Sequence, residues 1–178
     1  LDGIALLNLI ALHCKDVKAL SNDILMNIHN LSPFFIPINK HGVQSKAFIE
    51  NINNTYASDA QIAIFPAGLV SRRSNGIIED VEWKKSFITK SVQFKRDVVP
   101  VHISGRVSNF FYNLANLRKL LRVKTNIEML YLPNEMFKFK NKEITITFGE
   151  PVSYTKFSKE KSAVEWAEYI KEKVYKLA

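Results

Sequence analysis

The chain has 178 residues, of which 25 are lysine or arginine and 17 are aspartate or glutamate, so its formal net charge is +8. With 47% hydrophobic residues it can bury a substantial core, which excludes global disorder. Its single cysteine, Cys14, excludes an internal disulfide, and no apolar run approaches the roughly 18–20 residues of a membrane-spanning helix. The positive charge favours anionic partners: nucleic acid, an anionic membrane surface, or phosphorylated and thioester-carrier substrates.

Helices and strands are expected to alternate along the chain. Hydrophobic periodicity and turn residues predict these elements in order: helix 3–13, strand 17–20, helix 24–31, strand 34–39, helix 45–56, strand 61–65, loop 67–75, helix 82–94, strand 98–103, helix 110–121, strand 143–148 and helix 159–177. Alternation of this kind predicts an α/β fold, because each helix can serve as the crossover between neighbouring parallel strands. We expect a single domain with a mixed, largely parallel sheet flanked by helices.

Chemistry is expected at the ends of the predicted strands, because ligands of open α/β sheets bind there. The most informative segment follows strand 61–65, where Pro66-Ala67-Gly68 ends the strand and Arg72 and Arg73 come within one loop. Glycine allows a ligand to approach the backbone, and guanidinium groups bind phosphate through two hydrogen bonds. The alternative is an ordinary strand-exit turn with solvated arginines, and the residues alone leave both interpretations open.

The segment Phe65-Pro66-Ala67-Gly68, followed by Ser71-Arg72, resembles the third motif of the glycerolipid (lysophospholipid) acyltransferases, usually Phe-Pro-Glu-Gly-Thr-Arg-Ser. Its Pro-Ala-Gly form resembles the bacterial branch often labelled hemolysin-like, which includes acyltransferases that make ornithine lipids. Residues 35–40 resemble the second motif and residues 99–103 the fourth. Leu1-Asp2-Gly3 resembles the end of the first motif, in which a histidine and an aspartate lie a few residues apart.

The resemblance, which extends from Asp2 to about Val152, implies a glycerol-phosphate acyltransferase-like fold and an O-acyltransferase. Such an enzyme moves a fatty acyl group from acyl carrier protein or coenzyme A to the hydroxyl of a lysolipid. A histidine acts as general base, and Asp2 would fix its tautomer and stabilise the imidazolium. The resemblance places that histidine upstream of Leu1, so we expect residues 1–178 to be an acyltransferase domain without its N-terminal part. Asp2 could also cap the helix that follows it.

The resemblance also implies the residues that bind substrate: Lys40, Phe65, Pro66, Ala67, Gly68, Ser71, Arg72, Arg73 and His102. Lys40, Arg72 and Arg73 would hold the anionic head of the acceptor, and His102 would line the site. Two residues depart from the family motifs. Ala67 replaces a glutamate, which leaves open an acceptor other than lysophosphatidate, and Lys40 replaces an arginine and loses its bidentate geometry.

No metal or nucleotide cofactor is expected, because the sequence contains neither metal-ligand spacing nor a phosphate-binding glycine loop, and the acyl thioester is a co-substrate. Residues 110–122 combine aromatics and leucines with a basic end, which indicates either an interfacial helix on anionic lipid or a helix packed on the sheet. We expect a peripheral protein on the cytoplasmic face of a bacterial inner membrane. The alternative function is a non-catalytic lipid-binding module, and the absence of nucleic-acid-binding motifs disfavours a nucleic-acid partner.

Overall fold

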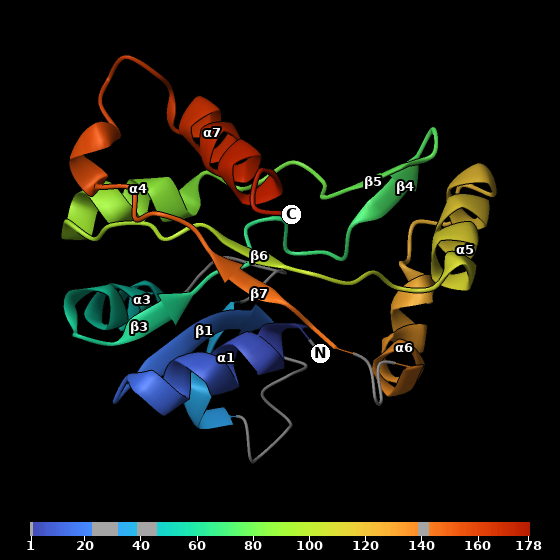
Figure 1. The fold of residues 1–178 in the computed structure, drawn as a ribbon, viewed down its shortest axis with the longest axis horizontal. Coiled ribbons are helices and arrows are strands. Elements are labelled where there is room, and N and C mark those ends of the chain that lie inside the picture. Colours follow the sequence, from blue (N-terminus) through green and yellow to red (C-terminus); the bar gives the residue numbers. More distant parts are fainter. Residues whose placement is uncertain (1, 23–31, 39–45, 139–142) are drawn as a thin grey trace.

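The computed structural model describes residues 2–22, 32–38, 46–138 and 143–178, in which helices and strands alternate (Figure 1). The helices are α1 (Asp2–His13), α3 (Lys46–Ala57), α4 (Ser86–Phe94), α5 (Asn109–Leu120), α6 (Leu132–Lys138) and α7 (Ala163–Tyr175), with 3₁₀ turns η1 (Ser32–Phe34), η2 (Ile127–Tyr131) and η3 (Tyr154–Lys156). The strands are β1 (Val17–Asn22), β2 (Phe35–Ile38), β3 (Gln61–Ala63), β4 (Arg72–Ser74), β5 (Ile77–Glu79), β6 (Val101–Ile103) and β7 (Ile146–Phe148). The predicted α/β fold is confirmed. The predicted helix 24–31 lies outside the described residues.

The strands form one parallel sheet and two antiparallel pairs. The parallel sheet has the order β2-β1-β3, and Ala19 of β1 lies opposite Phe35 of β2 and Ala63 of β3. Helix α3 is the crossover from β2 to β3, which parallel strands require. Strands β4 and β5 form an antiparallel hairpin, and β6 and β7 pair antiparallel. The sheet structure is therefore mixed, and its parallel part is the β2-β1-β3 sheet.

The first core lies between α1 and the parallel sheet. Leu6 and Leu7 of α1 are buried with residues of β1, β2 and β3, and partly buried residues of β6 and β7 pack against the same cluster. Only one side of α1 is buried, because Ile4 is 39% exposed and Leu12 is 72% exposed. The apolar residues of α1 are therefore buried on one side of the helix and not all round. The cluster joins the antiparallel β6–β7 pair to the parallel sheet.

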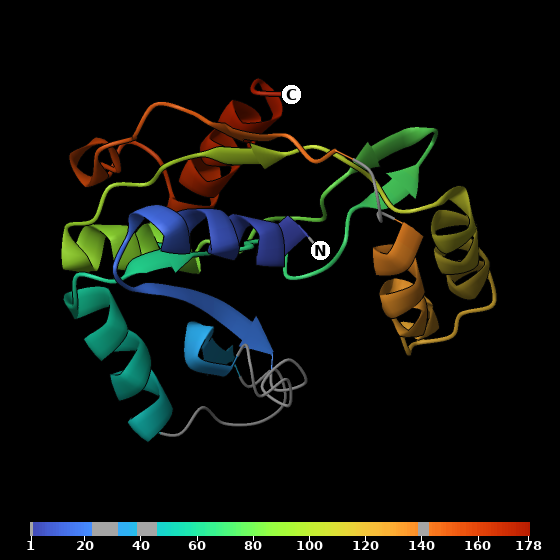
Figure 2. The same ribbon diagram turned by 60° about the horizontal axis from the view of Figure 1, so that its bottom comes forward.

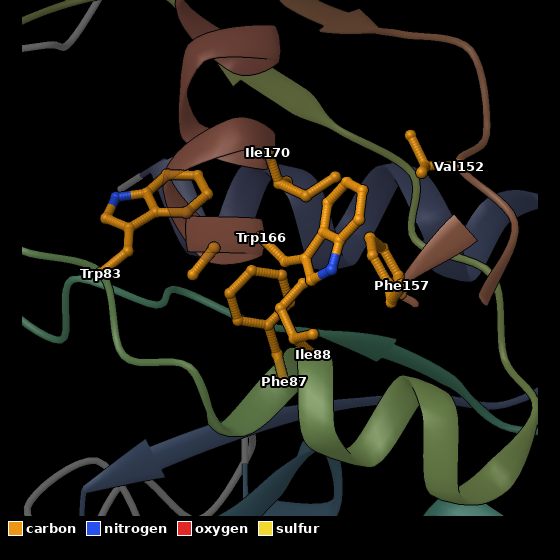
Figure 3. Packing of buried hydrophobic residues seen from close by; sticks show 8 residues of the cluster. Trp83, Phe87, Ile88, Val152, Phe157, Trp166 and Ile170 are labelled. Atoms are coloured by element: carbon orange, nitrogen blue, oxygen red, sulfur yellow. The ribbon is translucent and has the colours of Figure 1, made fainter. Parts of the chain in front are cut away.

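The second core joins α4 and α7 (Figure 3). Its buried members are Trp83, Phe87, Ile88, Val152, Phe157, Trp166, Ala167 and Ile170. Helix α7 begins later than predicted because Ser162 and Glu165 form a capping box, in which each side chain accepts a hydrogen bond from the backbone of the other residue. Trp166, Ala167 and Ile170 form the buried side of this helix.

Two segments between residues 67 and 138 form regular structure where the sequence predicted no helix or strand. Residues 72–79 form the β4–β5 hairpin, whose turn residues Asn75 and Gly76 have φ values of 50° and 82°. An Asn-Gly pair at positive φ is the usual sequence of a two-residue hairpin turn, so the sequence carried a signal for this hairpin. Residues 127–138 form η2 and α6, where no element was predicted. Both features lie beside α5 at one end of the molecule (Figures 1 and 2).

Candidate active site

The start of α1 meets the segment that follows β3. A Cβ atom on Gly3 would lie 3.2 Å from Cζ of Phe65, so the Phe65 ring lies directly against the glycine backbone. Asp2, the first residue of α1, precedes this glycine in the chain. The structure thus brings the segments that resemble the first and third acyltransferase motifs together, as expected. Lys40 lies outside the described residues.

Residues 65–68 form a tight turn. The Gly68 amide donates to the Phe65 carbonyl over 3.0 Å, and the Lys84 amide donates to the Pro66 carbonyl over 3.1 Å. Gly68 has a φ of 63°, a conformation that favours glycine. A Cβ atom there would lie 3.9 Å from Nζ of Lys84, so an ammonium group lies beside this backbone. Ala67 packs against the cluster around Trp83, which gives its small apolar side chain a structural role.

Asp80 fixes the segment that leads into β4. The Ser71 hydroxyl donates to Oδ1 of Asp80 over 2.7 Å, and the Trp83 indole donates to Oδ2 over 3.1 Å. The Asp80 amide donates to the Tyr175 hydroxyl over 2.8 Å, which ties the segment to α7. The Ser71 hydroxyl therefore donates its proton to Asp80. This contact supports a positioning role for Ser71, which the sequence predicted to bind substrate.

Replacing Asp80 by alanine is expected to lower the free energy of unfolding by about 2–3 kcal/mol, because two hydrogen bonds to a charged acceptor are lost. Asp80→Asn should lose less, since its amide oxygen still accepts one of them. Urea denaturation of the two variants measures the difference. Equal stability of wild type and Asp80→Ala would show that these hydrogen bonds do not hold the segment.

Arg72 is a buried residue of β4 and part of a buried ion cluster. Its exposed fraction is 7%, and its Nη2 donates to Oε1 of Glu128 over 2.9 Å. Oε2 of Glu128 lies 2.9 Å from Nε of Arg118, and the Glu128 side chain is 0% exposed. Burial lowers the pKa of Arg72, Glu128 opposes this shift, and Arg118 adds to it. Two guanidinium groups thus share one carboxylate, and the cluster has an excess positive charge.

The other terminal nitrogen of Arg72 has hydrogen-bond donors left. Nη1 is buried and makes no hydrogen bond to any residue within the described parts of the chain. The guanidinium lies 5.7 Å from the centroid of the Phe111 ring. Arg72 is therefore not a solvated arginine on an exit turn, and that alternative is wrong for this residue. A buried donor without an acceptor is costly, so an anionic group that reached Nη1 would be bound favourably.

Arg73 and His102 lie in different surroundings. Arg73 donates to the side-chain carbonyls of Asn113 and, over 3.4 Å, Asn109, so it fastens β4 to α5. His102 lies on β6 opposite Thr147. Its neighbours in β6 pack against the α1 core, so strand alternation places His102 on the other face. The substrate-binding roles of Arg73 and His102 stay predictions.

A family model described as Acyltransferase matches residues 1–178. The chain belongs to this acyltransferase family. It is 54% identical over 177 residues to a lyso-glycine lipid O-acyltransferase of Bacteroides thetaiotaomicron, covering 99% of the chain and 65% of that relative. It is 51% identical over 177 residues to a protein of the same name from Phocaeicola vulgatus, covering 99% and 63%.

The chain therefore spans 65% and 63% of the lengths of these curated relatives. No solved structure matches it significantly. The predicted membership of a lipid acyltransferase family is confirmed, whereas the hemolysin-like branch stays a prediction. In the part of the acyltransferase chain that the structure describes, no helix is both long and apolar enough to cross a bilayer.

Several groups at this candidate site were not predicted from the sequence: Lys84, Asp80, Arg118 and Glu128. Glu128 carried a weak signal, because it is an acidic residue within the otherwise apolar run Ile127–Tyr131 in a strongly basic segment. Among the described residues, no group of three or more histidine, cysteine, aspartate or glutamate side chains could hold a metal ion. The expectation that the enzyme works without a metal stays a prediction.

Proposed function

We propose that this chain is part of an enzyme that transfers an acyl group from a thioester donor to the hydroxyl of a lysolipid with an anionic head. The observation that carries the proposal is the buried guanidinium of Arg72, which is bound by Glu128 through Nη2 and keeps donors on Nη1. This group follows Phe65-Pro66-Ala67-Gly68, the segment that meets the start of α1. A buried guanidinium that follows the third motif closely in the chain fits an acceptor whose head carries a negative charge.

In the proposed reaction the acceptor hydroxyl attacks the thioester carbonyl directly. A carbon–oxygen bond forms and the carbon–sulfur bond breaks, while the hydroxyl proton passes to a histidine base and then to the departing thiolate. Asp2 orients this histidine and stabilises its protonated form. The donor is acyl carrier protein or coenzyme A, both of which are anionic, and the net charge of +8 favours their approach.

The preferred acceptor that we propose is a lyso-glycine lipid, the lipid in the names of both relatives. A glycine joined through its nitrogen keeps a free carboxylate. A planar carboxylate matches the planar guanidinium of Arg72 better than it matches an ammonium group. Because such acceptors reside in bilayers, we place the enzyme peripherally on the inner face of the bacterial inner membrane.

An acyl-transfer assay with the purified full-length protein tests the function. Lyso-glycine lipid, lysophosphatidate and lyso-ornithine lipid are offered in parallel, each with acyl carrier protein and coenzyme A thioesters. We expect kcat/KM to be about 10-fold or more higher for lyso-glycine lipid, which corresponds to roughly 1.4 kcal/mol of preference. Turnover of lysophosphatidate alone would contradict the proposed acceptor. Binding of lysolipid without turnover would favour the non-catalytic lipid-binding module.

A further inference from the structure

The segment 104–138, which includes α5, η2 and α6, presents only positive charge to solvent. Its acidic residues, Glu128 and Glu135, are 0% and 3% exposed. Glu128 is paired with Arg72 and Arg118, and Glu135 lies 2.6 Å from Nζ of Lys138. Burial opposes ionisation of Glu135, but hydrogen bonds from Lys138 and Ser108 outweigh it and hold its pKa below the usual range. The exposed charged side chains of the segment are Arg106, Lys119, Arg122, Lys124 and Lys138.

The same segment exposes large apolar side chains. Phe110, Leu117, Leu120, Leu121, Leu130 and Phe137 are 51%, 50%, 78%, 64%, 81% and 69% exposed. On α5 a spacing of seven residues places Phe110 and Leu117 on one side of the helix, away from the buried Phe111 and Ala115, and Leu121 is the C-cap residue that follows. The Phe110 ring lies 5.2 Å from that of Tyr131, which joins this side of α5 to η2. We call these six apolar residues and the five exposed cations the outer face.

The outer face lies at one end of the molecule. In both views α5 and α6 lie at the end of the molecule that carries the β4–β5 hairpin, away from α4 (Figures 1 and 2). Exposed apolar residues are common singly, but a group of this size on neighbouring elements marks an interaction surface. Apolar side chains beside exposed lysine and arginine are the composition of elements that lie in the head-group layer of an anionic bilayer.

We propose that the outer face docks the protein on an anionic lipid bilayer, with Leu120, Leu121, Leu130 and Phe137 inserted among the lipid chains and the cations on the head groups. The inference deepens the proposed function and rests on it, because a lysolipid acceptor is presented by a membrane. Charge complementarity selects anionic lipid, and the exposed leucines favour a bilayer over an acidic carrier protein, which basic side chains alone could attract.

The buried ion cluster links this surface to the site. Glu128 belongs to η2, Arg118 to α5 and Arg72 to β4, so one carboxylate fastens the docking elements to the strand that carries the proposed acceptor-binding group. Arg73 adds a second connection from β4 to α5 through Asn109 and Asn113. Docking through the outer face would therefore hold Arg72 at a fixed depth relative to the bilayer.

Vesicle co-sedimentation of the purified full-length protein tests this proposal. Vesicles of phosphatidylcholine are compared with vesicles of phosphatidylcholine and phosphatidylglycerol in equal parts. The variant Leu120→Ser/Leu121→Ser/Leu130→Ser should partition about 10-fold or more weakly, because the apolar contribution is lost. The matched control is Leu12→Ser/Ile49→Ser, which replaces side chains of α1 and α3 that are 72% and 44% exposed and should bind like wild type. Lys119→Gln/Arg122→Gln/Lys124→Gln should lose the preference for phosphatidylglycerol.

Turnover of detergent-dispersed acceptor separates this inference from the proposed function. The leucine variant should keep its thermal midpoint and its turnover in detergent while losing vesicle binding. Wild-type protein that turns over dispersed acceptor but binds no vesicles would overturn docking and leave the function standing. Vesicle binding without any turnover would remove the function and leave docking standing. Wild type that forms dimers through this face or retains acyl carrier protein on it, without binding vesicles, would also overturn the proposal.

Discussion

Replacing Glu128 by glutamine is expected to lower the free energy of unfolding by about 3–5 kcal/mol, because the change leaves two buried guanidinium groups without their counter-charge. Glu128 is fully buried, and the Arg72 and Arg118 side chains are 8% and 10% exposed. Glutamine has nearly the same size, so the loss would measure charge and not packing. Urea denaturation gives the free energy directly.

The matched control is Glu160→Gln, which removes a carboxylate from an exposed residue and should change stability by less than about 0.5 kcal/mol. Adding Arg118→Gln to Glu128→Gln should recover part of the lost stability, because one of the uncompensated charges is removed. A Glu128→Gln protein as stable as wild type would show that the cluster does not hold β4 to α5 and η2.

Asp2→Asn is expected to lower kcat/KM by about 10²–10⁴-fold, because an amide cannot stabilise a protonated general base. Asparagine has nearly the same size and shape as aspartate, so the start of α1 should be preserved. The acyl-transfer assay measures the loss, and the thermal midpoint should stay unchanged. The control Asp59→Asn removes an exposed carboxylate and should retain wild-type turnover. Wild-type turnover in Asp2→Asn would exclude Asp2 from the reaction.

Much of the fold was predictable because its signals are local. The apolar spacing of α7 and the short apolar runs of β1, β2 and β3 each depend on neighbouring residues, and the predicted elements are present. The β4–β5 hairpin was missed although Asn75-Gly76 is a local signal, because glycine and arginines nearby also fit a loop. The sequence also carried no strong signal for η2 and α6, because their buried glutamates pair with distant residues, Glu128 with Arg72 and Glu135 with Ser108.

The site was predictable only in part. The segments that resemble the first and third motifs contain Asp2 and Phe65, and the contact of Gly3 with Phe65 shows that these segments meet. The partner of Arg72 could not be predicted, because Glu128 is 56 residues away in sequence and nothing local pairs the two. The burial of Arg72 was not predictable either. Its guanidinium is paired with Glu128 through Nη2, and its remaining hydrogen-bond donors are on Nη1, so it is not a solvent-exposed cation.

Measuring the acceptor KM of Arg72→Lys tests most directly whether the buried Arg72 holds the acceptor's anionic head. Lysine keeps a positive charge for Glu128 but removes the donors of Nη1. With dispersed lyso-glycine lipid, we expect the acceptor KM to rise about 10-fold or more, as loss of a hydrogen bond to a charged group predicts, while the donor KM stays unchanged. The control Arg106→Lys, at an exposed position, should change neither the acceptor KM nor the donor KM. An unchanged acceptor KM in a folded Arg72→Lys protein would contradict the account.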